Sequence, residues 1–485
     1  MIWWWPFLLL VVCPYGMSQE CMQEPAQAYR FTGATCRITY PAAVVLNEKT
    51  TKVIEAAFQH TKYPAIKGEK TLLFWSKLVY SLDNLEIYNL TIGQSAFELR
   101  PGEGISLNIS NVSVVFRGNI HYACDGCLVN FGQSVDFEIE SQIDLGINPK
   151  LYCGKGKVAA DTTDCHLKFH KLNLLLHGDR EPNWLKKLFT NFLTFTIKVA
   201  VRSQICQEIN KVANILADFI QETAENFLTD GDISVDVGVT GTPVITANYI
   251  ESYHKGFTKY KNTTTVIEES NFNPRQLTEN RMLYFWLSDQ LFIPILKASH
   301  QDGRFQLNIS GPELRELFKT NPPDAMPEYI RECIMESSSS ELRVWSSSNV
   351  FLNTSRDFGT TAWADASGQL YCGGSTTPLL SFGTNVAIEV GPSYANKKLS
   401  LHGKVTDEEF EKIHTFLENA VKTLGVPTVI TVLETEITRL LDKQGVNLFD
   451  IYNPEVIPQD GYVVIQMDFG FPHHLLVEFL RKTLE

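Results

Sequence analysis

The segment at residues 135–147 is the strongest constraint on the fold, because its apolar and polar side chains alternate. A period of two residues predicts a β-strand, and 13 residues make this strand far longer than the usual length of about 5–6. One side carries Val135, Phe137, Ile139, Ile143, Leu145 and Ile147, and the other carries Asp136, Glu138, Glu140, Gln142 and Asp144. One apolar face and one hydrated face are typical of antiparallel sheets. We therefore expect a long antiparallel sheet wrapped over an apolar interior.

The two halves of the chain repeat one order of elements: a short helix, long strands, a long helix and closing strands. In the first half we expect a strand and then a helix from Cys36 onward, a strand at 105–110 with Asn108 on its outer face, a helix over 181–228 and a strand at 233–239. In the second half we expect strands at 282–287, 386–390, 399–405, 446–457 and 461–468, a helix capped by Ser288 and Asp289, and a long helix opened by a capping box at 406–409. The order indicates an internal duplication, although residues 337–383, rich in Ser, Thr and Gly, give no assignment.

The first 18 residues predict a signal peptide. The apolar run at 3–12 is too short to span a bilayer, and small residues follow at Gly16 and Ser18. No later segment reaches about 18 uncharged apolar residues, so we expect a soluble mature protein. Glycosylation sequons lie at Asn89, Asn108, Asn111, Asn262, Asn308 and Asn353. These features favour a secreted, extracellular glycoprotein.

Charge and missing motifs exclude several classes of protein. The formal net charge is −13, from 42 basic and 55 acidic residues, which argues against a nucleic-acid partner. The chain lacks the G-x-S-x-G turn of esterases, and it also lacks H-E-x-x-H, P-loop and G-x-G-x-x-G motifs. His166 and His170 fall on the polar side of a strand, where we expect surface histidines. We therefore expect no enzyme, no catalytic residue, no metal and no cofactor.

The cysteines predict disulfides and at least one thiol left over. Ten cysteines become nine when Cys13 leaves with the signal peptide, and an odd number leaves a free or intermolecular thiol. We favour a bridge between Cys165, at the start of a strand, and Cys206, in the long helix. Cys124 and Cys127 form a C-x-x-C pair, which is either a local disulfide or two unpaired thiols.

The end of the chain predicts an amphipathic helix that follows the closing strand. One side of this helix carries Phe471, Leu475, Leu476, Phe479 and Leu480. Three interpretations remain open from composition alone: an ordinary docked helix, a lid over an apolar opening, and a lipid-seeking helix.

Several long stretches resemble the family of bactericidal/permeability-increasing, lipopolysaccharide-binding and lipid transfer proteins. These stretches are CRITYPAAVVLNEKT, NVSVVFRG, REPNWLKKLFTNF, LTDGDISVD, GTPVITANYIES, RMLYFWLSD and GVNLFDIYNPEVIPQDGYVVIQMDFGFPHHLLVEFL. They cover most of the mature chain, and the terminal FGFPHHLLVEFL is similar to the members that transfer cholesteryl esters.

The resemblance implies an α+β fold, an elongated boomerang of two antiparallel β-barrels with long helices, joined by a central β-sheet and ending in a C-terminal amphipathic helix. The implied divisions are a signal peptide at 1–18, an N-terminal barrel domain at 19–254, a linker at 255–280, a C-terminal barrel domain at 281–462, and a closing strand with a lid helix at 463–485. The sequence of residues 255–280 is polar and lacks a hydrophobic period, which also predicts a linker there.

The function implied by the resemblance is exchange of cholesteryl esters, triglycerides and phospholipids between lipoproteins through an apolar tunnel, without chemical change. The cargo would be bound cholesteryl ester or triglyceride and phospholipid, and the partners would be surfaces of high-, low- and very-low-density lipoproteins. Polar tunnel positions carry over to Gln221, Ser252 and His254, whereas a basic family position is Thr223 here. The resemblance also supports the Cys165–Cys206 bridge. An alternative on the same fold is a lipid- or endotoxin-binding defence protein.

Overall fold

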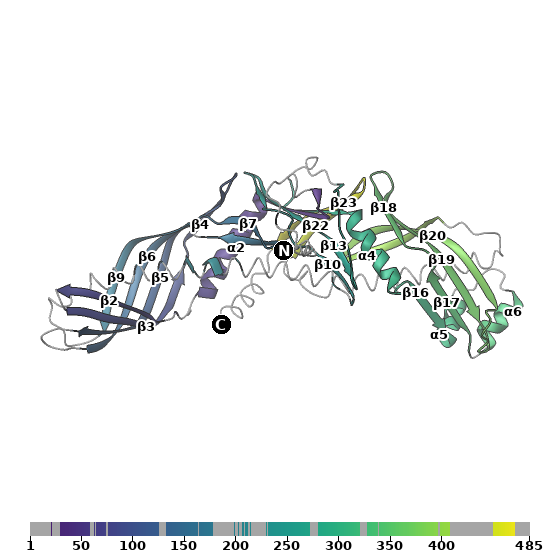
Figure 1. Ribbon diagram of the computed structural model, residues 1–485, viewed down its shortest axis with the longest axis horizontal. Helices are drawn as coiled ribbons and strands as arrows, with labels where there is room; N and C mark the ends of the chain where they lie inside the picture. Colours follow the sequence, from purple (N-terminus) through teal and green to yellow (C-terminus); the bar gives the residue numbers. More distant parts are fainter. Residues whose placement is uncertain are drawn as a thin grey trace, which may run out of the picture.

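The computed structural model describes residues 30–58, 65–73, 76–125, 132–177, 231–271, 280–320, 327–407 and 450–470, with small interior gaps, and single positions elsewhere. In this part of the chain, three larger sheets follow one another along an elongated molecule (Figure 1). An N-terminal sheet lies at one end, a C-terminal sheet lies at the other, and a central sheet lies between them.

The N-terminal sheet is antiparallel and built from long strands. Its order is β2-β3-β5-β6-β9, with β4 added to β5. The bounds are β2 (Ile66–Leu73), β3 (Ser76–Thr91), β4 (Gln94–Arg100), β5 (Gly104–Asp125), β6 (Gly132–Ile147) and β9 (Cys165–His177). Along β6, Phe137, Ile139 and Leu145 are buried, whereas Glu140 and Gln142 are exposed. The long one-sided strand predicted by the sequence is therefore confirmed.

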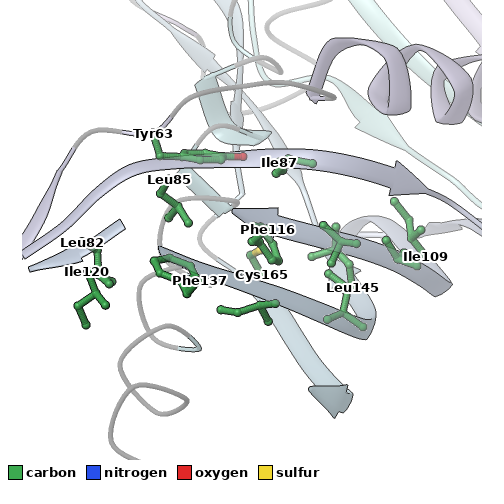
Figure 2. Packing of buried hydrophobic residues seen from close by; sticks show 14 of the residues in the cluster. Tyr63, Leu82, Leu85, Ile87, Ile109, Phe116, Ile120, Phe137, Leu145 and Cys165 are labelled. Carbon is green, nitrogen blue, oxygen red and sulfur yellow. The ribbon is translucent and has the colours of Figure 1, made fainter. Parts of the chain in front are cut away.

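The inner face of this sheet carries one continuous apolar cluster. Figure 2 shows side chains from four strands gathered in it: Leu82, Leu85, Ile87, Ile109, Phe116, Ile120, Phe137, Leu145 and Cys165. Burying one such large side chain contributes about 1.5–3 kcal/mol. Half-buried residues of β9, among them Leu167, Phe169 and Leu172, extend the same apolar surface beyond the sealed core.

A stretch of helix is fastened to the start of β9 by covalent and polar contacts. A disulfide joins Cys165 to Cys206, as predicted from the sequence. The side-chain oxygen of Asn210 accepts hydrogen bonds from the backbone N–H and the hydroxyl of Thr162, at 3.2 and 2.9 Å. Most of the helix predicted at 181–228 lies outside the described residues.

Other cysteines tie down both halves of the chain. Cys21 is joined to Cys153 on β7 (Lys150–Gly154), which pairs with β8 (Lys157–Asp161). A third disulfide, Cys333–Cys372, lies in the C-terminal half. Among the described cysteines Cys36 is a free thiol, which fits the odd number in the mature chain. Cys127 lies outside the described residues, so the state of the C-x-x-C pair stays open.

The central sheet joins segments from the beginning, middle and end of the chain. Its order is β11 (Val244–Ile245), β12 (Tyr249–His254), β1 (Ala34–Thr39), β15 (Leu283–Ser288), β23 (Tyr462–Gly470) and β22 (Asp450–Gln459). Helix α2 (Tyr40–Phe58) follows β1 directly, and α4 (Asp289–Gln301) follows β15 directly. The hydroxyl of Ser288 accepts a hydrogen bond from the N–H of Gln290, which confirms the predicted N-cap.

The stretch predicted as a linker at 255–280 needs correction in its first part. It contains β13 (Phe257–Tyr260) and β14 (Thr263–Thr265), which pair antiparallel and join β10 (Ile233–Asp236) in a three-stranded sheet. Strands of three and four residues are too short to show a hydrophobic period, and their pairing with β10 is a tertiary effect.

The C-terminal sheet occupies most of the segment for which the sequence gives no assignment. Its order is β16-β17-β19-β20-β21, with β18 added to β19. The bounds are β16 (Gln306–Ser310), β17 (Glu341–Ser346), β18 (Phe351–Ser355), β19 (Gly359–Tyr371), β20 (Leu380–Ala395) and β21 (Lys398–Asp407), with α5 (Gly311–Thr320), α6 (Glu328–Arg331) and the π-helix η2 (Glu332–Glu336) nearby. A Cβ on Gly368 would lie 2.1 Å from the ring of its cross-strand partner Phe382, so the glycine is what lets that ring pack here.

Two predicted helices remain predictions. The helix that follows 406–409 and the terminal helix at 471–485 lie outside the described residues, apart from positions 406 and 407, which end β21. Among the residues that the structure describes, no helix has the length and apolar character needed to cross a membrane.

Candidate functional site: an open apolar face on the central sheet

One face of the central sheet carries apolar side chains that are only half-buried. Direct cross-strand partners lie on the same face of a sheet. The pairs Ser252–Cys36, Cys36–Phe285, Phe285–Ile465 and Ile465–Val456 therefore form one row across five strands. All five side chains keep intermediate solvent exposure. We call this side of the sheet the open face.

The neighbouring rows extend the open face in both directions along the strands. Ile250, Ile38 and Leu283 form the next row on one side and are also half-buried. On the other side, Leu287 packs against the buried cluster of Val235, Val237 and Leu291, so this end of the face is covered. The open part is thus the middle of the sheet, where strands from both halves of the chain meet.

The opposite face of the same sheet is sealed. Tyr284, Trp286, Tyr462 and Val464 form a buried cluster on it. It also holds the ion pair of Arg37 and Glu251, whose side chains are only 5% and 4% exposed, with 2.6 Å between guanidinium and carboxylate. Leaving either charge unpaired at such a site costs about 3–5 kcal/mol. The pair therefore joins β1 to β12 on the sealed face, and neither charged side chain lies on the open face.

Ser252 and His254 are the polar side chains on the open face of β12. The Ser252 hydroxyl lies 2.8 Å from His254 Nε2, and His254 Nδ1 lies 2.9 Å from the carbonyl oxygen of Val237. A carbonyl can only accept, so Nδ1 carries the proton and Nε2 accepts from the Ser252 hydroxyl. Burial lowers the pKa of His254, which keeps the imidazole neutral. The pair carries no net charge, and the Ser252 oxygen keeps lone pairs that can accept a hydrogen bond from a ligand.

Cys36 lies second in the row, between Ser252 and Phe285. Burial, with a smaller contribution from the Glu251 carboxylate, raises the pKa of its thiol to about 12. The side chain is therefore a protonated, weakly polar thiol, which behaves as a small hydrophobe.

Comparison with known proteins places the chain in a family. The sequence profile described as "LBP / BPI / CETP family, N-terminal domain" matches residues 45–219. The chain is 40% identical over 489 residues to the cholesteryl ester transfer protein of Homo sapiens, covering 98% of this chain and 99% of that protein. It is 38% identical over 475 residues to the cholesteryl ester transfer protein of Gallus gallus, covering 94% of each. The chain belongs to the LBP / BPI / CETP family.

Other members of the LBP / BPI / CETP family are more distant. The lipopolysaccharide-binding protein of Homo sapiens is 22% identical over 283 residues, which is 57% of each chain. A crystal structure of lipopolysaccharide binding protein aligns with 91% of this chain and 99% of its own, at a TM-score of 0.47 and 15% identity.

The structure places some of the predicted site residues and not others. Ser252 and His254 are brought into contact on the open face, whereas Gln221 and the terminal helix residues lie outside the described residues. The asparagines of all six sequons are exposed, as glycosylation requires. His166 and His170 are also exposed, as expected. Sequence reasoning missed Cys36, Phe285 and Ile465, and their one available signal was alternation within short strands.

Proposed function

We propose that this chain carries neutral lipids and phospholipids, and that it transfers cholesteryl esters and triglycerides between lipoprotein surfaces in plasma. Relatives named as cholesteryl ester transfer proteins, at about 40% identity over nearly the whole chain, are the observation that carries the proposal. The half-buried row on the open face supports it, because such a row suits a hydrocarbon ligand. In its finer form the proposal includes two barrels in a boomerang, with a lipid tunnel that passes the open face.

The energetic need for such a carrier is large. An oleoyl-sized chain has about 16 methylenes, and exposing them to water costs on the order of 13 kcal/mol at about 0.8 kcal/mol each. A barrier of that size slows transfer by roughly nine powers of ten. Apolar surfaces of the N-terminal sheet and the open face would remove most of this penalty, and no bond needs to break.

The Ser252–His254 pair has the spacing of a nucleophile and its general base, but its surroundings do not suit ester hydrolysis. A general base works best when its pKa is near the working pH, and burial lowers that of His254. The Nδ1 proton is held by the carbonyl of Val237 and not by a carboxylate that would stabilise an imidazolium. We therefore assign Ser252 to orienting a lipid headgroup that carries a hydrogen-bond donor, because the Ser252 proton is directed to His254 and its oxygen can only accept from a ligand.

The deciding experiment is transfer of doubly labelled cholesteryl oleate from donor to acceptor vesicles, with both the sterol and the acyl group followed. We expect both labels to arrive together and no free cholesterol or fatty acid to form, with wild type and with Ser252→Ala. Hydrolysis that is lost in Ser252→Ala would contradict intact transfer. If the protein instead bound lipopolysaccharide micelles tightly and moved no ester, the defence function on the same fold would replace the proposal.

A further inference from the structure

The hairpin of β18 and β19 carries two large aromatic side chains on its outer face. Phe351 lies directly opposite Trp363, and the rings stack with centroids 6.0 Å apart and planes 20° from parallel. Phe351 is 50% exposed and Trp363 is 43% exposed. The fold thus leaves a flat aromatic surface facing outward, which is a surface on which a ligand with an apolar face can stack.

Asn353 lies on the same outer face, two residues further along β18. Exposure alternates along this strand: Phe351 and Asn353 are exposed, whereas Thr354 is buried. Side chains two residues apart on a strand point to the same side, with a rise of roughly 7 Å between them. Asn353, Thr354 and Ser355 also form a glycosylation sequon. A sugar attached to Asn353 would therefore begin next to the aromatic stack, on the same face of the strand.

We propose that a glycan on Asn353 folds back along β18, and that its first N-acetylglucosamine packs its C–H face on Phe351 and Trp363. The rings supply a π-surface, and the pyranose supplies a face of polarised C–H groups. The sugar's hydroxyl and acetamido groups remain directed to water. The modified hairpin would thereby lose its exposed aromatic surface without needing a partner protein.

The hairpin is held rigidly enough to present this surface in one geometry. The backbone N–H and the hydroxyl of Thr354 donate to the carboxylate of Asp289 at 2.7 and 2.6 Å. The carbonyl oxygen of Thr354 accepts from the N–H of Gly461 at 2.9 Å. These contacts fix the inner side of β18 against α4 and the turn before β23, next to which β18 lies in Figure 1. Only the outer face remains for the glycan.

The sequons at Asn308 and Asn262 lack this stacked, exposed aromatic pair. Two residues before Asn308, on β16, stands Gln306, and the cross-strand partner of Asn308 is Arg343. Two residues before Asn262 stands Tyr260, but this residue is only 8% exposed. Asn308 therefore serves as a control in the same half of the chain: it is an exposed strand sequon with no stacked aromatic pair beside it, and the one ring across the strand, Trp345 opposite Gln306, is half-buried.

The test is a double-mutant cycle on protein secreted from mammalian cells. Glycopeptide mass spectrometry first establishes the occupancy of Asn353. The melting midpoint is then measured for wild type, Asn353→Gln, Phe351→Ala and the double variant. We expect Asn353→Gln to lower the midpoint by on the order of 2 °C in the wild-type background and to have little effect when Phe351 is already Ala. Asn308→Gln should change the midpoint equally in both backgrounds.

A second measurement tests which sugar is responsible. Protein with high-mannose glycans is trimmed by endoglycosidase H, which leaves one N-acetylglucosamine on each site, and this protein should keep its melting midpoint. An unoccupied Asn353, or an equal loss on Asn353→Gln in both backgrounds, would overturn the proposal. So would quenching of Trp363 by brominated phosphatidylcholine vesicles, measured as the difference from Trp363→Phe, because the face would then be a lipid contact.

Discussion

The polar groups that face the proposed lipid site are held uncharged by their surroundings. Burial lowers the pKa of His254, and burial raises the pKa of Cys36 to about 12, so both side chains are neutral near pH 7. The buried charges of the central sheet, Arg37 and Glu251, are paired on the opposite face. A charge beside a hydrocarbon chain is costly to desolvate, so this distribution suits an apolar ligand.

Stability near pH 6 should depend on His254. Its pKa is lower in the folded state than the ordinary value of 6.5, so below that value the unfolded chain binds a proton that the native protein does not. Stability is therefore lost as pH falls through 6.5, with a slope of at most about 1.4 kcal/mol per pH unit from this group. Denaturant unfolding between pH 7.5 and 5.5 should show a shallower slope for His254→Gln than for wild type. The exposed His177→Gln is the control, and an unchanged slope in His254→Gln would contradict the argument.

Helix α4 is joined to the C-terminal sheet through the first residue of the helix. Asp289 is buried, and its two carboxylate oxygens accept from the N–H and the hydroxyl of Thr354, which lies 65 residues later on β18. A negative charge is also favourable at a helix N-terminus. One carboxylate thus contributes to the helix end and to the seat of the β18–β19 hairpin.

Asp289→Asn should destabilise the protein by about 1–3 kcal/mol, because one acceptor becomes an amide donor that faces a donor of Thr354. Urea unfolding monitored by circular dichroism measures this loss. The exposed Asp365→Asn on β19 removes a carboxylate from the same sheet, and it should change stability by less than about 0.5 kcal/mol. Equal effects of the two changes would mean that the Asp289 contact contributes nothing specific.

Some strands could be predicted from the sequence and others could not. β6 was predictable because its inner positions are apolar and its outer positions are polar. β19 was not, because its inner surface is shaped by Gly368 beneath Phe382, a contact between strands that no local period reports. The open face was missed for a further reason. On β1 the charged side chain of Arg37 is buried on the sealed side, whereas the apolar Cys36 is more exposed. This is the reverse of the usual pattern, in which polar residues mark the exposed face of a strand.

The terminal helix stays a prediction, and truncation tests it. We expect removal of residues 471–485, or Leu476→Glu, to reduce cholesteryl ester transfer sharply while secretion and the main unfolding transition change little. The reason is that the closing strand β23 already completes the central sheet, so the helix is left to cover lipid. Glu478→Lys, on the opposite side of the predicted helix, is the matched control. Unchanged transfer, or failure of secretion, would make the helix a structural element.

The two halves of the molecule meet in one sheet and share one face. β1 and β15 are antiparallel neighbours, and each runs directly into a helix, α2 or α4, before its own half continues. This arrangement agrees with the duplication in element order that the sequence indicates. The row through Cys36 and Phe285 therefore combines a side chain from each half. A lipid that passes from one end of the elongated molecule to the other would cross this row.

A larger side chain at Cys36 on the open face should block that passage. Cys36 is the smallest apolar side chain of its row and lies between Ser252 and Phe285, so enlarging it adds volume where the side chains are only half-buried. In the series Cys36→Ala, Cys36→Leu and Cys36→Trp, we expect vesicle-to-vesicle cholesteryl ester transfer to fall progressively, by on the order of tenfold or more at Trp. The melting midpoint should not follow the same order, and Cys36→Ala should transfer like wild type. Full transfer by a folded Cys36→Trp variant would show that cargo does not pass the open face, whereas a melting midpoint that falls in parallel with transfer would mean that Cys36 acts through packing alone.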